Sequence, residues 1–152
     1  MHKIKQVFGY ILLALLIGFS TASAFAQSML HEEIQTECLR IVPAELSPFL
    51  QMQLCSQTKT ANSSIECFLV SAPTMEAEVG VELCANAPIQ NPSGPNSCFV
   101  NVPSKFAGTT TNDQQAAKLC AQAIDLRPVE CFKANILKGW TVADSIESCK
   151  IR

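Results

Sequence analysis

Cysteines are the residues of this 152-residue chain whose type and spacing could most readily do chemistry. Paired thiols bind zinc or exchange disulfides, and an activated thiolate can act as a nucleophile. The chain has eight cysteines but no Cys-x-x-Cys pair, so their spacing favours neither a zinc ribbon nor a thioredoxin-type redox site. We therefore expect structural disulfides. The cysteines are Cys38, Cys55, Cys67, Cys84, Cys98, Cys120, Cys131 and Cys149.

Other groups that could support catalysis are few. Beyond the first 26 residues His31 is the only histidine, and the chain has no G-x-S-x-G nucleophile motif. Glu78 and Glu82 lie one helical turn apart, with Glu76 nearby, and paired carboxylates can transfer protons or bind a cation. Exposed glutamates on a short amphipathic helix give the same pattern, and we favour that interpretation. The sequence thus predicts a non-enzymatic protein with no catalytic residue, no cofactor and no metal site.

The N-terminal segment has the composition of a signal peptide. It begins with a basic stretch, continues with an apolar run over residues 7–19, and ends in Ala24-Phe25-Ala26, which fits the small-x-small cleavage rule. A membrane anchor is the alternative, but the apolar run is shorter than the ~20 residues that cross a bilayer. We predict a signal peptide over residues 1–26, cleavage between Ala26 and Gln27, and no stable membrane insertion after cleavage.

Residues 27–152 are predicted to form a single cysteine-rich domain that is periplasmic or secreted. Removing Lys3 and Lys5 leaves nine basic residues against 13 acidic ones, a net charge of about −4. No basic cluster is left that would bind nucleic acid or an anionic membrane surface. In an exported chain, the default state of the eight cysteines is four disulfides. A protein partner, unidentified by the sequence, is compatible with this composition.

The cysteines mark four repeated units, which begin at Cys38, Cys67, Cys98 and Cys131, at intervals of 29, 31 and 33 residues. Small helical units of about this length commonly stack. A helix breaker separates the two cysteines of every unit; the breakers are Pro43, Pro73, Pro103 with Gly108, and Gly139. Each unit is thus predicted to be two short helices, with its first cysteine opening the first helix and its second cysteine closing the second.

Sequence patterns also predict the helix starts and the core. The predicted N-caps are Ser47 (followed by Pro48), Thr74 and Thr141, and the segments Ser63–Glu66 and Thr111–Gln114 match capping boxes. The predicted core residues lie next to the cysteines or three positions before the second one; they are Leu39, Phe68, Phe99, Phe132, Met52, Val81, Ala117, Ile146, Leu54, Leu83 and Leu119. The expected fold class is all-α, with four disulfide-stapled short helical hairpins packed as a small array or bundle.

Two disulfide schemes are compatible with four such hairpins. An antiparallel hairpin brings its first and last residues together, which favours Cys38–Cys55, Cys67–Cys84, Cys98–Cys120 and Cys131–Cys149. The alternative joins neighbouring units through Cys55–Cys67, Cys84–Cys98 and Cys120–Cys131, and leaves Cys38 to pair with Cys149. We prefer the hairpin scheme, because it leaves no terminal cysteine without a partner in its own unit.

Two loops and one aromatic residue are further candidates for recognition. The proline-rich loop Asn86–Asn96 and the insertion Lys105–Thr111 vary the unit length, and expanded loops of repeat proteins often bind partners. Trp140 is the only tryptophan and follows the Gly139 turn, where it could anchor a partner. Unselected drift in loop length and a tryptophan that fills a turn are the simpler explanations.

The segment Leu119–Ala123, followed by Pro128–Phe132, carries the pattern Leu-Cys-x-x-Ala…Pro-x-x-Cys-Phe. In this pattern the chain resembles uncharacterised exported bacterial proteins with a cysteine-containing helical repeat. The resemblance supports the fold and implies no activity, since such proteins have none assigned. The sequence predicts an exported, non-enzymatic structural or protein-binding module stabilised by disulfides. A secreted effector, either toxin-like or an inhibitor protein, is the alternative.

Overall fold

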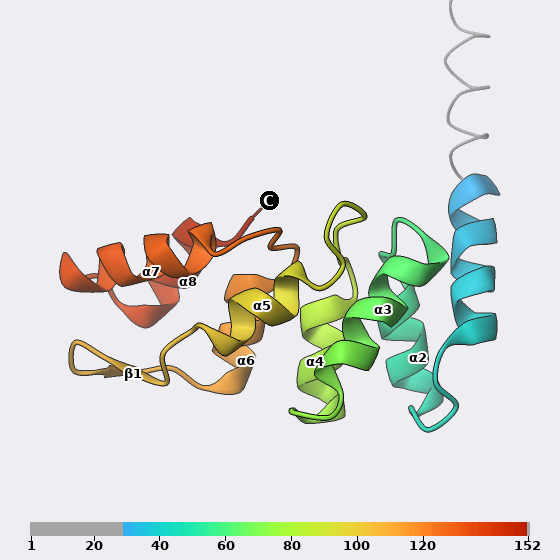
Figure 1. Ribbon diagram of the computed structural model, residues 1–152, viewed down its shortest axis with the longest axis horizontal. Coiled ribbons are helices and arrows are strands. Elements are labelled where there is room, and N and C mark those ends of the chain that lie inside the picture. The colour runs from blue at the N-terminus through green and yellow to red at the C-terminus, as the bar shows by residue number, and fades with distance from the viewer. Residues whose placement is uncertain (1–28, 152) are drawn as a thin grey trace, which may run out of the picture. The chain divides into compact units, whose positions relative to one another are not determined.

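The computed structural model describes residues 29–151, and Figure 1 shows the order of their helices and strands. The predicted signal peptide and its cleavage position between Ala26 and Gln27 lie outside these residues. The chain divides into two compact units after Glu33, and all eight cysteines lie in the second unit, residues 34–152.

The described residues are mostly helical, as predicted. A helix over residues 29–41 is followed by α2 (Pro48–Cys55), α3 (Ala61–Ser71), α4 (Ala77–Cys84), α5 (Gly94–Val100), α6 (Asp113–Cys120), α7 (Arg127–Leu137) and α8 (Val142–Cys149). Between α5 and α6, strands β1 (Lys105–Phe106) and β2 (Thr109–Thr110) form a two-stranded antiparallel hairpin. The expectation of an all-α fold made of disulfide-stapled helical hairpins is confirmed.

The predicted breakers separate the two helices of each unit. The helix over residues 29–41 ends before Pro43, and α3 ends at Ser71, before Pro73. After α7, Gly139 adopts a φ of 85°, a left-handed conformation in which glycine has no steric penalty. In the third unit Pro103 follows α5, and the β1–β2 hairpin then returns the chain to α6.

The second helices of the four units lie in a row. Helix α2 contacts α4, α4 contacts α6, and α6 contacts α8, while α3, α5 and α7 each pack against the second helix of their own unit (Figure 1). Helices α2 to α8 have only 7 to 11 residues, and such short helices are marginally stable in water on their own. Their stability therefore comes from contacts between helices and from the disulfides.

Most of the predicted core residues are buried. Leu54, Leu83 and Leu119, which directly precede the second cysteines, have no exposed surface. Phe68, Phe132, Val81, Ala117 and Ile146 are also buried, whereas Leu39 and Phe99 are half-buried. The prediction for Met52 was wrong, because its side chain is 51% exposed. Helix α2 is the first of the row, so no preceding second helix covers the face that carries Met52.

The second cysteine ends its helix in every unit, as predicted, but the first cysteine does not open its helix. Cys67 is the seventh residue of α3, and Cys98 and Cys131 are the fifth residues of α5 and α7. The last turn of each second helix therefore lies beside the middle of its partner. The first helices begin earlier than the cysteine pattern predicted, and this gives the paired helices a longer contact.

Two of the predicted N-caps are confirmed. The Ser47 hydroxyl accepts a hydrogen bond from the Leu50 amide at the start of α2, and the Thr141 hydroxyl accepts one from the Asp144 amide at the start of α8. The prediction for Thr74 was wrong: its hydroxyl donates to the Ser71 carbonyl, and α4 begins after Glu76.

Neither capping box forms at its predicted position. At α6 the box is formed by Asn112 and Gln115, one residue later than predicted, with backbone-to-side-chain distances of 2.8 and 3.0 Å. Helix α3 is capped by Thr60, so Ser63 and Ser64 lie inside the helix. The Ser64 hydroxyl donates to the Ala85 carbonyl at the end of α4.

Candidate functional site

The sulfurs of this protein are used for four bridges, one within each hairpin. The pairs are Cys38–Cys55, Cys67–Cys84, Cys98–Cys120 and Cys131–Cys149, with Cα–Cα distances between 5.5 and 5.7 Å. These distances lie at the usual value for a disulfide. No cysteine is free, and none of the bridges connects two units. This is the hairpin scheme preferred from the sequence, and it leaves no thiol for catalysis or metal binding.

The remaining candidate groups do not form a catalytic cluster in the described part of the chain. His31 is exposed in the helix over residues 29–41, and Glu76 is exposed at the start of α4. Within residues 29–151, no three His, Cys, Asp or Glu side chains are placed to hold a metal ion. Glu78 and Glu82, by contrast, line a groove together with residues from two other units.

The groove runs over the row of second helices and has a volume of about 640 Å³. Pockets of about this size bind small molecules or short segments of a partner. Its walls come from α2, α4, α6 and the residues just after them, which belong to the first three units. The polar side chains that line it are Gln53, Gln57, Glu78, Glu82, Asn86, Gln114 and Gln122, and Ser47 and Ser56 add two hydroxyl-bearing residues.

The groove is built from equivalent positions of the repeat. Gln57, Asn86 and Gln122 each lie two residues after the second cysteine of their unit, so each of the first three units contributes one carboxamide there. The fourth unit has Ile151 at this position, which ends the series. We refer to Gln57, Asn86 and Gln122 as the carboxamide ladder.

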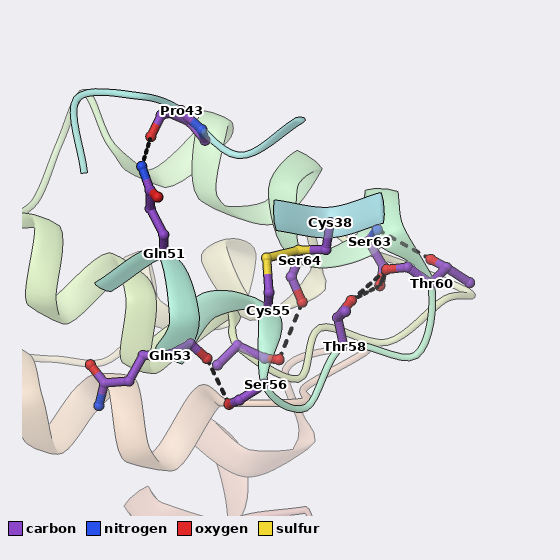
Figure 2. Close-up of a disulfide and its surroundings, with 11 residues drawn as sticks. Cys38, Pro43, Gln51, Gln53, Cys55, Ser56, Thr58, Thr60, Ser63 and Ser64 are labelled. Atoms are coloured by element: carbon purple, nitrogen blue, oxygen red, sulfur yellow. Dashed lines mark hydrogen bonds between the residues drawn. A yellow bond between two sulfur atoms is a disulfide. The ribbon is translucent and has the colours of Figure 1, made fainter. Parts of the chain in front are cut away.

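A second set of equivalent positions lies on the helices themselves. Phe49, Glu78 and Gln114 are each six residues before the second cysteine, and Gln53, Glu82 and Lys118 are two residues before it, although Lys118 does not line the groove. Because the disulfides fix the ends of α2, α4 and α6, these positions fall on the same face of neighbouring helices. Figure 2 shows that the Gln53 amide extends away from the Cys38–Cys55 bridge, so the bridge and the polar face lie on opposite sides of α2.

Charge in the groove is of one sign. Glu78 and Glu82 contribute two carboxylates, and none of the described residues that line the groove is a lysine, arginine or histidine. Neither carboxylate forms an ion pair or a side-chain hydrogen bond with any other described residue, and the same holds for the amides of Gln53, Gln57, Gln114 and Gln122. These groups therefore face solvent and are available to a bound molecule.

Two residues of the carboxamide ladder have unusual local environments. The Oδ1 atom of Asn86 is buried and has no hydrogen-bond partner among the described residues. The backbone of Gln122 has a φ of 67°, in the left-handed region that is unfavourable for a residue with a side chain. This conformation belongs to the turn after α6, in which the Ala123 amide donates to the Cys120 carbonyl at 2.9 Å.

The proline-rich loop supports the Gln122 corner of the groove. The Asn91 side-chain amide donates to the Ile124 carbonyl at 2.9 Å, and Gly94 lies so close that an added Cβ would be 2.3 Å from the Ala123 carbonyl oxygen. This loop, a candidate for recognition in the sequence, contacts and positions the chain after α6. It is also shorter than predicted, since α5 begins at Gly94 and includes Pro95 in its first turn.

The sequence alone did not predict most of the residues that line this groove. The sequence patterns single out Glu78 and Glu82, interpreted as a solvated face, and Asn86 as the first residue of the proline-rich loop. A signal was present, because a residue with a carboxamide follows the second cysteine at the same distance in three units. The sequence did not show that these positions face one groove, since that depends on how the hairpins pack side by side.

Comparison with protein-family models, with curated proteins and with solved structures gives no match for this chain. Within residues 29–151, no helix has both the length and the apolar character that a membrane span requires. The description of the candidate site therefore rests on its own geometry and chemistry.

Proposed function

We propose that this protein is an exported, non-enzymatic module that binds a partner polypeptide in the groove over α2, α4 and α6. The observation that carries the proposal is the carboxamide ladder, in which Gln57, Asn86 and Gln122 occupy the same repeat position and line the same groove. Repeat proteins commonly bind through surfaces that span several stacked units. The groove is such a surface.

The chemistry of the ladder suits a peptide backbone. A carboxamide has a donor and an acceptor side by side, as a peptide unit has, so the two can pair in register. Packed helices lie about 8–10 Å apart. An extended or polyproline-like chain advances about 3.1–3.3 Å per residue, so about three residues of a partner would span the distance from one unit to the next.

Export is supported by two independent features. The N-terminal segment has the pattern of a signal peptide that ends at Ala26, and the four disulfides are typical of proteins in oxidising compartments. We expect the exported product to begin at Gln27, which N-terminal sequencing of the protein from a periplasmic or culture-medium fraction can test. A product that retains Met1 in the cytosol would contradict this part of the proposal.

Peptide binding can be tested by selection followed by nuclear magnetic resonance. The disulfide-bonded protein is used to select linear peptides from a random display library, and the selected peptides are synthesised and titrated into the ¹⁵N-labelled protein. We expect amide shifts to be concentrated at α2, α4, α6 and the residues just after them. Shifts confined to other elements, or a failure to select any peptide, would overturn the proposal.

The ladder can be tested with matched variants. Gln57→Ala removes a ladder amide at an exposed position, and Gln90→Ala removes an amide that is also exposed but lies outside the groove. We expect Gln57→Ala to weaken peptide binding several-fold and Gln90→Ala to leave it unchanged. Equal effects of the two substitutions would show that the ladder is not the binding site.

A further inference from the structure

The charge of the groove indicates which kind of polypeptide it binds. Building on the proposed function, we infer that the partner is an extended segment with arginine or lysine side chains, which pair with Glu78 and Glu82. Both carboxylates line the groove from the same face of α4. This inference specifies the charge of the ligand, which the carboxamide ladder alone leaves open.

Glu78 and Glu82 are four residues apart on one helix, so their charges repel each other. No described residue that lines the groove supplies a compensating cation, and neither glutamate pairs with a cation elsewhere in the described chain. A guanidinium or ammonium group in the groove would relieve this repulsion and add charge-assisted hydrogen bonds. An acidic segment would instead meet two like charges.

The neighbours of the glutamates are consistent with a cationic ligand. Phe49 occupies the same repeat position as Glu78 on the adjacent helix, lines the groove and is 70% exposed. An exposed aromatic ring next to two carboxylates can pack against the aliphatic part of an arginine or lysine and attract its charge through the ring face. On the opposite side, Gln114 adds a neutral amide that can bond to the partner backbone.

The test uses three synthetic twelve-residue peptides that differ only in charge. The first repeats Ala-Arg-Pro, the second replaces each arginine by citrulline, which is neutral and has nearly the same shape, and the third replaces each arginine by glutamate. Affinity is measured by fluorescence anisotropy at low and at physiological salt. We expect the arginine peptide to bind at least tenfold more tightly than the citrulline peptide, with the difference reduced by salt.

Variants of the disulfide-bonded protein assign the effect to the groove. The double variant Glu78→Gln/Glu82→Gln should reduce the affinity for the arginine peptide about tenfold and leave that for the citrulline peptide unchanged. The matched control is Glu66→Gln/Glu130→Gln, which removes two exposed glutamates on α3 and α7, outside the groove, and should change neither affinity. Glutamine is a helix former similar to glutamate, so all variants are expected to fold, and circular dichroism verifies this.

The outcomes separate this inference from the proposed function. Equal binding of the arginine and citrulline peptides, with shifts that map to the groove, would overturn the inference and leave the proposed function standing. An arginine preference that the control variant loses as strongly as the groove variant would also overturn it, because general surface charge would then be the cause. If no peptide shifts the groove resonances, both proposals are wrong.

Discussion

At the scale of single residues, the position of a side chain in the row of helices decides how much it contributes to stability. Phe132 has no exposed surface, whereas Met52 is 51% exposed, although the sequence placed both in the core. The sequence identifies which face of a helix is apolar. It does not show which helix stands at the end of the row.

Phe132→Ala and Met52→Ala provide a direct comparison of these two environments. The first substitution leaves a cavity between α7 and its neighbours and should lower the free energy of unfolding by about 3–5 kcal/mol. The second removes a largely solvated side chain, and we expect a change of less than about 1 kcal/mol. Chemical denaturation with the disulfides intact measures both. Equal losses would contradict the placement of Met52 at the surface.

Titration of Glu37 tests a local electrostatic contact. Arg40 donates hydrogen bonds of 2.6 and 2.9 Å to the Glu37 carboxylate and adds an attractive charge, which together lower the pKa of Glu37 below its ordinary value of 4.5. A carboxylate whose pKa is lowered by folding stabilises the protein above its unfolded pKa, and this contribution is lost as the pH falls through the folded pKa. The contribution is therefore fully present at neutral pH, and its change with pH is confined to the acidic range.

Arg40→Gln should raise the pKa of Glu37 towards its ordinary value, which a carboxyl ¹³C titration can follow. The matched control is Arg127→Gln, which removes an exposed arginine that pairs with Asp125 instead. We expect the control to leave the pKa of Glu37 unchanged. A similar rise in both variants would mean that net charge, rather than the contact with Arg40, lowers this pKa.

At the scale of helices, the C-terminal ends were predicted better than the N-terminal ends. A second cysteine is the last residue of α2, α4, α6 and α8, because the disulfide holds that turn against the first helix. The start of a helix depends on which of several neighbouring polar residues becomes its N-cap. Several of these can cap a helix, and contacts between hairpins decide among them.

Helix α3 illustrates this choice. Thr60 and Ser63 can each act as an N-cap. In the structure the N-cap is Thr60, whose hydroxyl accepts a hydrogen bond from the Ser63 amide. Figure 2 shows Ser63 and Ser64 close to Cys55 and Thr58, within the packed junction between the first two units. The hydrogen bond from Ser64 to Ala85 joins residues 21 positions apart, and such a long-range contact cannot be read from a local pattern.

The displaced capping box of α6 gives a test at this scale. Asn112→Ala removes the side chain that accepts from the Gln115 amide and should cost about 1 kcal/mol of stability. Gln114→Ala alters the residue that the sequence pattern assigned to the box, and we expect it to change stability by less than about 0.5 kcal/mol. Thermal unfolding of the two variants compares them. A larger loss for Gln114→Ala would restore the predicted position of the box.

At the scale of the whole described domain, short helices and local disulfides make stability depend on the bridges. Closing a loop of 17 to 22 residues stabilises a fold by about 3 kcal/mol in the chain-entropy model. Four such bridges are comparable to the total stability of a typical domain. Reduction under mild conditions should therefore unfold the protein, and far-ultraviolet circular dichroism would show loss of helix. An unchanged spectrum in excess reductant would contradict this expectation.

The groove is formed by several repeat units together. Its polar groups come from equivalent positions in three hairpins, so it exists only where neighbouring second helices lie side by side. The repeat is evident from the sequence, but the carboxamide two residues after each of the first three second cysteines was not among the predicted features. The packing that turns this repeated position into a continuous surface was not predicted either, because it depends on contacts between residues far apart in the chain.

Disulfide mapping tests the central claim, that each hairpin is closed on itself, most directly. Tryptic cleavage after Arg40, Lys59 and Lys105, without reduction, separates Cys38, Cys55 and Cys67 into three different peptides. Mass spectrometry should find the Cys38 peptide joined to residues 41–59 as an isolated pair. Residues 41–59 joined to residues 60–105 would show a bridge between units. Such a bridge would contradict both the hairpins and the groove that they align.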